Sequence, residues 1–273
     1  MLEFIIGLAL ILLAYLFIKL LKNGAKQLLI PLLILIFLLP SPKATTEHAD
    51  AALFRENKWA EGTNNEEFIV KIKQQVLLDI PVISQFPELP RGCEVTSLAM
   101  LLNHAGVTVD KMTLAKEIKK NPATFEKKDG KIYYGHPNDG FIGDMYSFNN
   151  RGLGVYHTPI KELAENYLPE KIHDFTGDDF SSIKTHLSNE KPVWVIINTK
   201  YNELPDAYFQ TWHTPSGVID ITYKEHSVLV TGYDEQYIYF NDPFSNIKNK
   251  KAPIKEFQAG WEQMGRQAIT YLN

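Results

Sequence analysis

Cys93, the only cysteine of this 273-residue chain, follows Gly92 at the expected start of a helix. Apolar residues with the spacing of one helix face predict that this helix spans 93–105; they are Val95, Leu98, Ala99 and Leu102. A thiol in the first turn lies near unpaired N–H groups and the positive end of the helix dipole, which favour the thiolate. The position indicates a nucleophile, although an isolated cysteine is more often a small buried apolar residue.

A second group of reactive side chains lies in a segment that is typical of a β-hairpin turning at 233–236. His226 stands at the open end of its first strand, and Asn241 and Asp242 stand at the open end of its second strand. A two-residue loop places Asn241 on the face of His226, whereas a three-residue loop places Asp242 directly opposite it. An imidazole that serves a thiol needs a carboxylate or an amide on its other ring nitrogen. The alternative is that these are ordinary polar residues at strand ends.

The elements that must position these groups change in type along the chain. Helices are predicted over 93–105, 112–119, 158–168, 178–187 and near 254–261, and strands over 76–83, 192–198, 219–223, 226–233, 236–241 and 266–272. The stretches 121–157 and 200–218 show no sustained periodicity and are expected to be loops that border a groove. Helices first and strands later predict an α+β fold with a helical lobe followed by an antiparallel sheet lobe.

Three segments together resemble the C39-like cysteine peptidases, in the stand-alone branch with a papain-like fold. They are QFPELPRGCEVTS from Gln85, HSVLVTGYD from His226 and NDP from Asn241, and the resemblance covers about residues 78–272. It implies that Cys93 is the nucleophile and His226 its proton-transfer partner. It also implies that Asp242 orients the imidazole, with Asn241 as the alternative, and that Gln85 donates to the oxyanion beside the Cys93 N–H.

The resemblance further implies a peptidase or amide hydrolase that acts on peptide substrates and needs no cofactor. Members that trim double-glycine leader peptides carry this domain in an ATP-driven exporter, but the chain has no G-x-x-x-x-G-K-[ST] run. Leader-peptide processing is therefore not expected. Two alternatives stay open, namely an inactive papain-like module that binds envelope peptides and a thiol acyltransferase that uses an amine acceptor.

The first forty residues differ from the rest of the chain because they are almost wholly apolar. We interpret 4–18 and 28–39 as two membrane segments, and the lysines between them, at 19, 22 and 26, as cytoplasmic. This predicts lipid contact at 1–40, a polar linker at 41–75 and an extracytoplasmic peptidase domain at 76–273. A cleaved signal peptide would export the domain as well, whereas a buried hairpin would not.

Composition excludes several other classes of function. A net charge of −4 gives no reason to expect a nucleic-acid partner. A single cysteine excludes an intramolecular disulfide and a cysteine-rich zinc site. The histidines at 136, 157, 173, 186 and 213 lack the spacing of metal ligands, so no metal is predicted.

Overall fold

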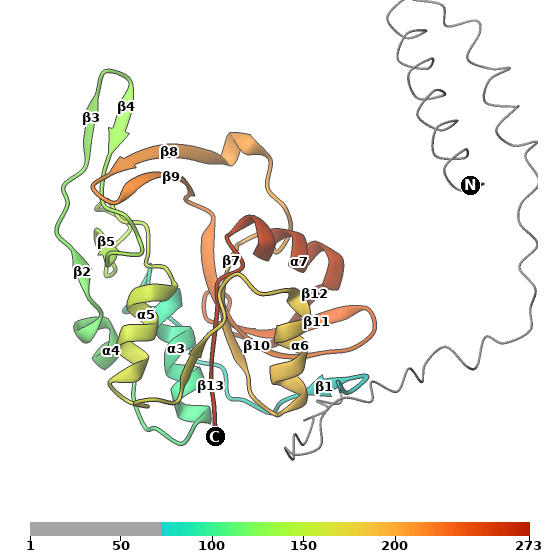
Figure 1. Ribbon diagram of the computed structural model, residues 1–273. Helices are drawn as coiled ribbons and strands as arrows, with labels where there is room; N and C mark the ends of the chain where they lie inside the picture. The colour runs from blue at the N-terminus through green and yellow to red at the C-terminus, as the bar shows by residue number, and fades with distance from the viewer. Residues whose placement is uncertain (1–71) are drawn as a thin grey trace, which may run out of the picture. The chain divides into compact units, whose positions relative to one another are not determined.

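The computed structural model describes residues 72–273, and Figure 1 colours them from blue-green to red. The predicted membrane segments at 1–40 and nearly all of the predicted linker lie outside the described residues. Within 72–273, no helix has the length and apolar character needed to cross a membrane.

A seven-stranded antiparallel sheet forms the centre of the described region. Its strands run in the order β12-β11-β10-β7-β13-β6, and β1 also pairs with β10. Their bounds are Ile247–Pro253 (β12), Tyr237–Asp242 (β11), Glu225–Tyr233 (β10), Val193–Asn198 (β7), Ala268–Tyr271 (β13), Ile172–Asp174 (β6) and Val76–Leu77 (β1). Every residue of β7 and β10 is buried, so the sheet is covered on both faces there.

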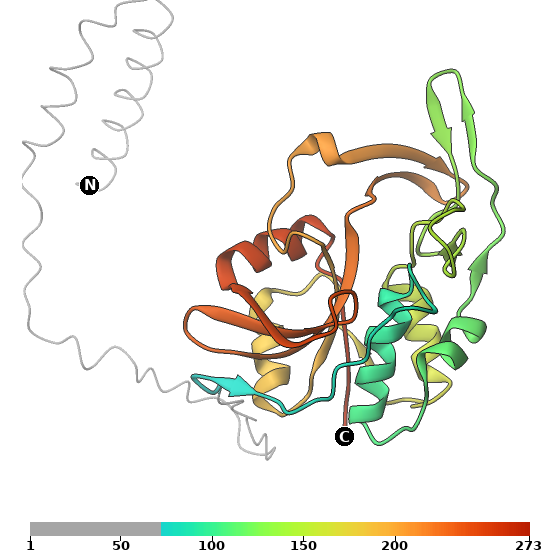
Figure 2. The ribbon, with the colours of Figure 1, turned by 180° about the vertical axis from the view of Figure 1, so that it is seen from behind.

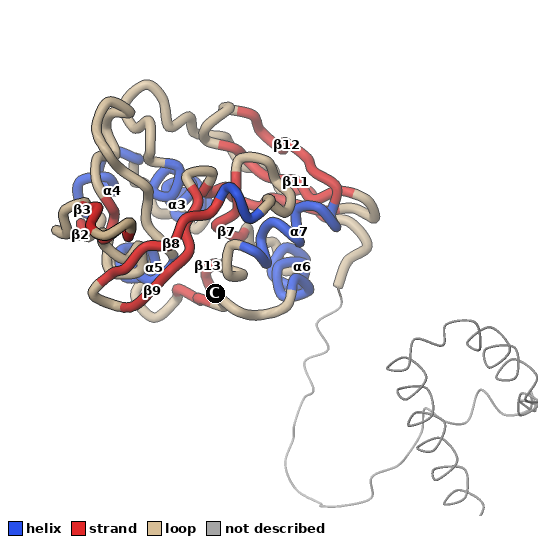
Figure 3. Tube along the Cα trace, turned by 90° about the horizontal axis from the view of Figure 1, so that it is seen from above, coloured by secondary structure: helices blue, strands red, loops and turns tan. Residues whose placement is uncertain are grey.

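Helices cover both faces of this sheet, as Figure 3 shows from above. The bounds of the helices are Cys93–His104 (α3), Lys111–Glu117 (α4), His157–Glu165 (α5), Phe180–Ser188 (α6) and Ile254–Gln263 (α7). Helices α3, α4 and α5 share a core with Trp194 and Ile196 of β7. Helices α6 and α7 share another core with Val193 and Val195 of the same strand. The alternation of side chains along β7 thus supplies both cores.

A smaller four-stranded sheet projects beyond the central sheet, and Figure 2 shows it from behind. It runs in the order β3-β4-β8-β9, with bounds Glu126–Lys128, Lys131–Tyr133, Phe209–Thr214 and Gly217–Thr222. A 3-10 turn, η2 (Asp206–Tyr208), precedes β8, and β2 (Lys120–Asn121) pairs in parallel with β5 (Phe141–Ile142). The fully buried Trp212 lies in a third core, with Tyr134, Ile142, Leu153 and Ile221.

The structure confirms a fold of mixed helices and antiparallel strands, but it corrects several details. The helix predicted at 93–105 and the buried strand at 192–198 are present with nearly those bounds. The strand predicted at 76–83 is only two residues long, and the predicted loops contain β2 to β5, η2 and β8. Helices also lie on both faces of the sheet, so the strands do not form a lobe without helices.

The hairpin register differs from both registers that the sequence allowed. Near the turn, Tyr233 is opposite Ile238, and beyond a bulge Leu229 is opposite Asn241. The bulge adds a residue that loop length alone cannot predict. Neither of the two predicted registers, which placed Asn241 on the face of His226 or Asp242 directly opposite it, is therefore present.

Helix α3 is fixed to the sheet by buried polar contacts as well as by apolar packing. The Ser97 hydroxyl donates to the Ser227 carbonyl of β10 over 3.2 Å, and the Trp194 indole of β7 donates to the Glu94 carbonyl over 3.0 Å. These bonds set the position of the first turn of α3 relative to the two central strands.

Ser97→Ala is expected to lower the free energy of unfolding by about 1 kcal/mol, because a buried hydrogen bond is lost. Ser181→Ala, at an exposed position of α6, is the matched control and should change it by less than about 0.5 kcal/mol. Urea unfolding followed by circular dichroism measures both. Equal effects of the two substitutions would show that the Ser97 bond does not help to hold α3.

Candidate active site

Cys93 is the first residue of α3 and is 7% exposed. The helix begins after Gly92, where a Cβ atom would lie 2.6 Å from that of Leu89, so only glycine permits the close approach of the preceding turn. The sulfur is therefore held at the N-terminus of a helix that is docked on β7 and β10.

His226 lies on β10 with 2% of its surface exposed. Its Nε2 atom is 2.8 Å from Oδ1 of Asp242, the last residue of β11. The rings of Tyr201 and Phe244 stand edge-on to the imidazole, with centroids 6.2 and 6.1 Å away. The carboxylate and the two rings hold the plane of the imidazole, and Nδ1 is the ring nitrogen that does not contact Asp242.

Asp242 is fully buried, and both of its carboxylate oxygens accept hydrogen bonds. Besides the bond to His226, Oδ1 accepts from the Phe244 N–H, while Oδ2 accepts from Ser245, from the Tyr201 hydroxyl (2.8 Å) and from the Lys250 ammonium (2.8 Å). Burial by itself raises the pKa of Asp242, but the bonds and charges of His226, Lys250 and Ser245 outweigh it and hold that pKa far below its usual range.

Asn241, the alternative partner for the imidazole, is turned away from it. Its side-chain amide donates to the Ile80 carbonyl over 2.9 Å and accepts from the Asn249 N–H over 3.0 Å. Because alternate residues of a strand point to opposite faces, the register that brings Asp242 to His226 excludes Asn241.

Cys93 and His226 line one cavity of about 120 Å³, with Gln85 also on its wall. Phe148 and Phe244 add apolar surface to it. Residues far apart in the sequence therefore meet at one hollow between the start of α3 and the start of β10. A larger cavity of about 310 Å³ lies elsewhere, beside His136, His157 and Asp220, and includes neither Cys93 nor His226.

Gln85 is placed beside the cysteine, but its amide is already engaged. Its Nε2 donates to the carbonyls of Leu89 (3.2 Å) and Pro90 (2.7 Å), and its buried Oε1 has no hydrogen-bond partner. An amide nitrogen has two protons, so a donor role toward an oxyanion requires it to release one of these carbonyls.

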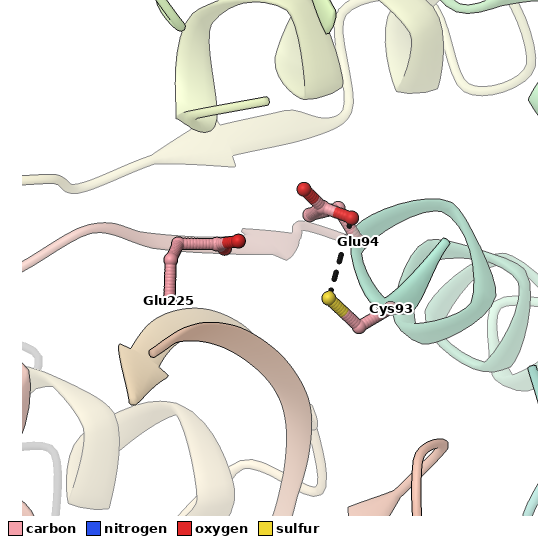
Figure 4. Close-up of side chains that lie close together, drawn as sticks. All are labelled: Cys93, Glu94 and Glu225. Atoms are coloured by element: carbon pink, nitrogen blue, oxygen red, sulfur yellow. Dashed lines mark hydrogen bonds between the residues drawn. The ribbon is translucent and has the colours of Figure 1, made fainter. Parts of the chain in front are cut away.

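Two buried glutamates that the sequence analysis did not single out lie beside the sulfur. Candidate ligand atoms of Cys93, Glu94 and Glu225 all lie within 4.8 Å of one another. The thiol donates to Glu94 Oε2 over 3.3 Å, and Figure 4 shows the Glu225 side chain extending toward them from β10. Each glutamate adjoins a reactive residue in the sequence, Glu94 after Cys93 and Glu225 before His226, and that adjacency was the available signal.

The glutamates change the electrostatics expected for the thiol. Burial, followed by the charges of Glu94 and Glu225, raises the pKa of the Cys93 thiol well above its ordinary value. The prediction that the helix N-terminus favours the thiolate is therefore wrong for this state of the site, because desolvation and two carboxyls outweigh the helix dipole. Burial also raises the pKa of Glu94 to about 7 and, with the nearby Glu94 charge, that of Glu225 well above its usual range.

Comparison with known proteins identifies the family. Residues 77–269 match the model of the Peptidase_C39 like family. The chain therefore belongs to the C39-like peptidase family. It is 48% identical over 194 residues to the uncharacterized protein YvpB of Bacillus subtilis (strain 168), covering 70% of this chain and 74% of YvpB.

A solved structure from Bacillus anthracis, described as a putative C39-like peptidase, has the same architecture as this member of the family. It is 44% identical, with a TM-score of 0.69, and the match covers 74% of this chain and 98% of that one. Membership of this family supports a peptidase-like function. The mixed helix and strand fold described above is also that of the solved relative.

The pKa of Glu94 makes stability depend on pH. Its rise from 4.5 to about 7 means that the folded chain holds a proton that the unfolded chain releases, so the free energy of unfolding should fall as pH rises from 4.5 to 7. Glu94→Gln should reduce this fall by roughly 3 kcal/mol, since one pKa unit is worth 1.36 kcal/mol. Urea unfolding from pH 4.5 to 8 measures it, with the exposed Glu235→Gln as control. Parallel curves for Glu94→Gln and the parent chain would contradict the assignment.

Proposed function

We propose that this chain is a cysteine peptidase of papain-like fold that hydrolyses peptide or amide bonds through Cys93, His226 and Asp242. The observation that carries the proposal is that Cys93 and His226 line one cavity while Asp242 occupies Nε2 of the imidazole. A fixed imidazole beside a thiol at a helix N-terminus is the arrangement that nucleophilic catalysis by cysteine needs.

The proposed reaction proceeds through an acyl-enzyme. The thiol proton passes to His226 Nδ1, the sulfur bonds to the substrate carbonyl carbon, and the carbonyl oxygen becomes an oxyanion beside the Cys93 N–H. As the C–N bond breaks, His226 returns the proton to the leaving amine. Water, deprotonated by His226, then attacks the thioester and releases the acid and the thiol.

Gln85 is the proposed second donor to the oxyanion. It lines the cavity with Cys93. To donate to an oxyanion, its amide must give up one of its two hydrogen bonds to the loop carbonyls. A charge-assisted bond to an oxyanion is stronger than a bond to a neutral carbonyl, so the exchange is favourable when the oxyanion forms. Asp242 stays ionised throughout and holds the imidazole in the tautomer that this sequence of steps uses.

The second candidate function is an inactive module that binds peptides in the same cavity. The raised pKa of the Cys93 thiol and the engaged amide of Gln85 favour it, because both describe a site that is not poised for attack. Turnover distinguishes the two functions.

Cys93→Ala is expected to abolish hydrolysis of a peptide-library substrate, with a fall in kcat of at least about a thousandfold, because no other residue supplies the nucleophile. Activity-based labelling and hydrolysis of the parent chain and the variant measure this, and circular dichroism checks that the fold is kept. Hydrolysis that survives in Cys93→Ala would remove the mechanism, and a parent chain without turnover would favour the binding module.

We also propose that 1–40 attaches the chain to the lipid bilayer and that the catalytic part acts on peptides outside the cytoplasm. The support is in the sequence, where two apolar runs flank lysines 19, 22 and 26.

Protease shaving of cells with a permeable wall should therefore remove the 76–273 region without lysis, and the chain should sediment with membranes. Immunodetection of a C-terminal tag measures both, with a cytoplasmic protein as control. A tag that becomes protease-sensitive only after lysis would contradict this location.

A further inference from the structure

One polar group at the cavity beside Cys93 has no role in the steps above. Glu225 is 9% exposed and lines the cavity together with Cys93 and His226, yet its buried Oε1 atom has no hydrogen-bond partner. A buried carboxyl oxygen without a donor costs free energy, so it marks a place where a donor binds.

A second buried carboxyl, that of Glu94, lies beside Glu225 and adds to the negative charge that a donor would offset. Glu94 is fully buried, and its oxygens accept from the Val155 N–H over 2.7 Å and from the Cys93 thiol. Gly154 leaves room for both glutamates, because a Cβ atom at that position would collide with each carboxyl. None of the ion pairs within 72–273 involves Glu94 or Glu225.

The cations nearest to the pair are occupied elsewhere. The Arg91 guanidinium also lines the cavity, but it donates to the carbonyls of Asp144 and Ser147 and lies 5.0 Å from the Phe148 ring centre. The Lys120 ammonium donates to the Ala115 carbonyl over 3.0 Å. The Lys120 charge acts on Glu94 and lowers its pKa, but within 72–273 neither Glu94 nor Glu225 forms an ion pair with a cation.

We propose that Glu225, supported by Glu94, binds an ammonium group of the substrate that is attached next to the scissile carbonyl, namely the α-ammonium of an amino-terminal residue. The inference rests on the proposed function and names its substrate class, which is a peptide or amide whose first residue is the acyl donor.

Bond lengths select the α-ammonium over a lysine side chain. In a reactive complex the sulfur is about 3–3.5 Å from the carbonyl carbon, and the α-nitrogen is about 2.5 Å from that carbon. Carboxyl oxygens within 4.8 Å of the sulfur can therefore reach the α-nitrogen. A lysine ammonium stands at the end of a flexible four-carbon stem and would reach these oxygens only if the stem folded back, at a cost in conformational entropy.

The size of the cavity agrees with a short acyl group. Pockets that hold drug-sized ligands have volumes of about 300–1,000 Å³, whereas this one is about 120 Å³. By itself it accommodates one small residue, and an adjoining hollow of about 460 Å³ shares Arg91, Phe148, Gly152 and Tyr223 with it. A bound ammonium would also offset the carboxyl charges that disfavour the thiolate, so the substrate itself would help to activate the nucleophile.

Binding is tested on the full-length Cys93→Ala chain, which cannot turn over a ligand by the proposed route. Calorimetric titration at pH 7 with EDTA compares alaninamide, which has a free α-amine, with N-acetylalaninamide. We expect the free amine to bind at least tenfold more tightly. Adding Glu225→Gln should abolish this preference, Glu225→Asp should keep part of it, and the exposed Glu235→Gln should leave it unchanged.

Kinetics on the parent chain provide the second readout, with coumarin amides of alanine, N-acetylalanine and Nα-acetyllysine. We expect kcat/KM for free alanine to exceed that of both acetylated substrates at least tenfold, and Glu225→Gln to reduce this ratio toward one. Equal binding of the two amides, or a preference that survives Glu225→Gln, would overturn the inference while leaving Cys93-dependent hydrolysis intact. Selective binding without any Cys93-dependent hydrolysis would support the ammonium site and overturn the proposed function instead.

Discussion

The buried carboxylate of Asp242 is the constraint on which the rest of the site depends. A fully desolvated carboxylate costs several kcal/mol unless donors surround it, and here the donors come from separate segments. The imidazole is on β10, Lys250 is on β12, and Tyr201 follows β7. Satisfying this one charge therefore requires the central strands to assemble in register, and the same assembly orients His226. The orientation of the His226 imidazole and the stability of the sheet are thus coupled.

The two carboxyl environments of the site differ in a way that suggests separate roles. Asp242 is surrounded by donors that hold its pKa far below its usual range, whereas Glu94 and Glu225 are buried together with few donors, and burial raises the pKa of both. In the proposed reaction, the first arrangement stabilises the cation that forms on His226. The second places two carboxyls next to the sulfur that form no ion pair within 72–273. Desolvation accounts for both behaviours, and the number of donors decides between them.

The sequence predicted those parts of the fold that repeat with a regular period. The apolar stripe from Val95 to Leu102 located α3, and the β-branched run from Val193 located β7. It missed β12, because IKNKKAP has the lysine-rich composition of an edge strand rather than a buried alternation. It also left the register of β10 and β11 open, since the bulge near Gly232 depends on tertiary packing.

For the site, residue types and their order singled out Cys93 and His226, the family resemblance favoured Asp242 over Asn241, and neither described their surroundings. Spacing along the chain does not tell which way Glu94 or Glu225 points, and both point toward the sulfur because α3 and β10 pack against each other. The engaged amide of Gln85 likewise depends on a local turn that brings the Leu89 and Pro90 carbonyls to it. Long-range contacts of this kind are set by tertiary structure.

The central claim is that Cys93 and His226 act as one pair, and the pH dependence of thiol alkylation tests it most directly. The rate of Cys93 modification by iodoacetamide is measured from pH 5 to 10 in the parent chain and in His226→Ala. The account predicts that below pH 8 the substitution slows alkylation at least tenfold. Superimposable profiles over the whole range would contradict the pairing of the thiol with the imidazole.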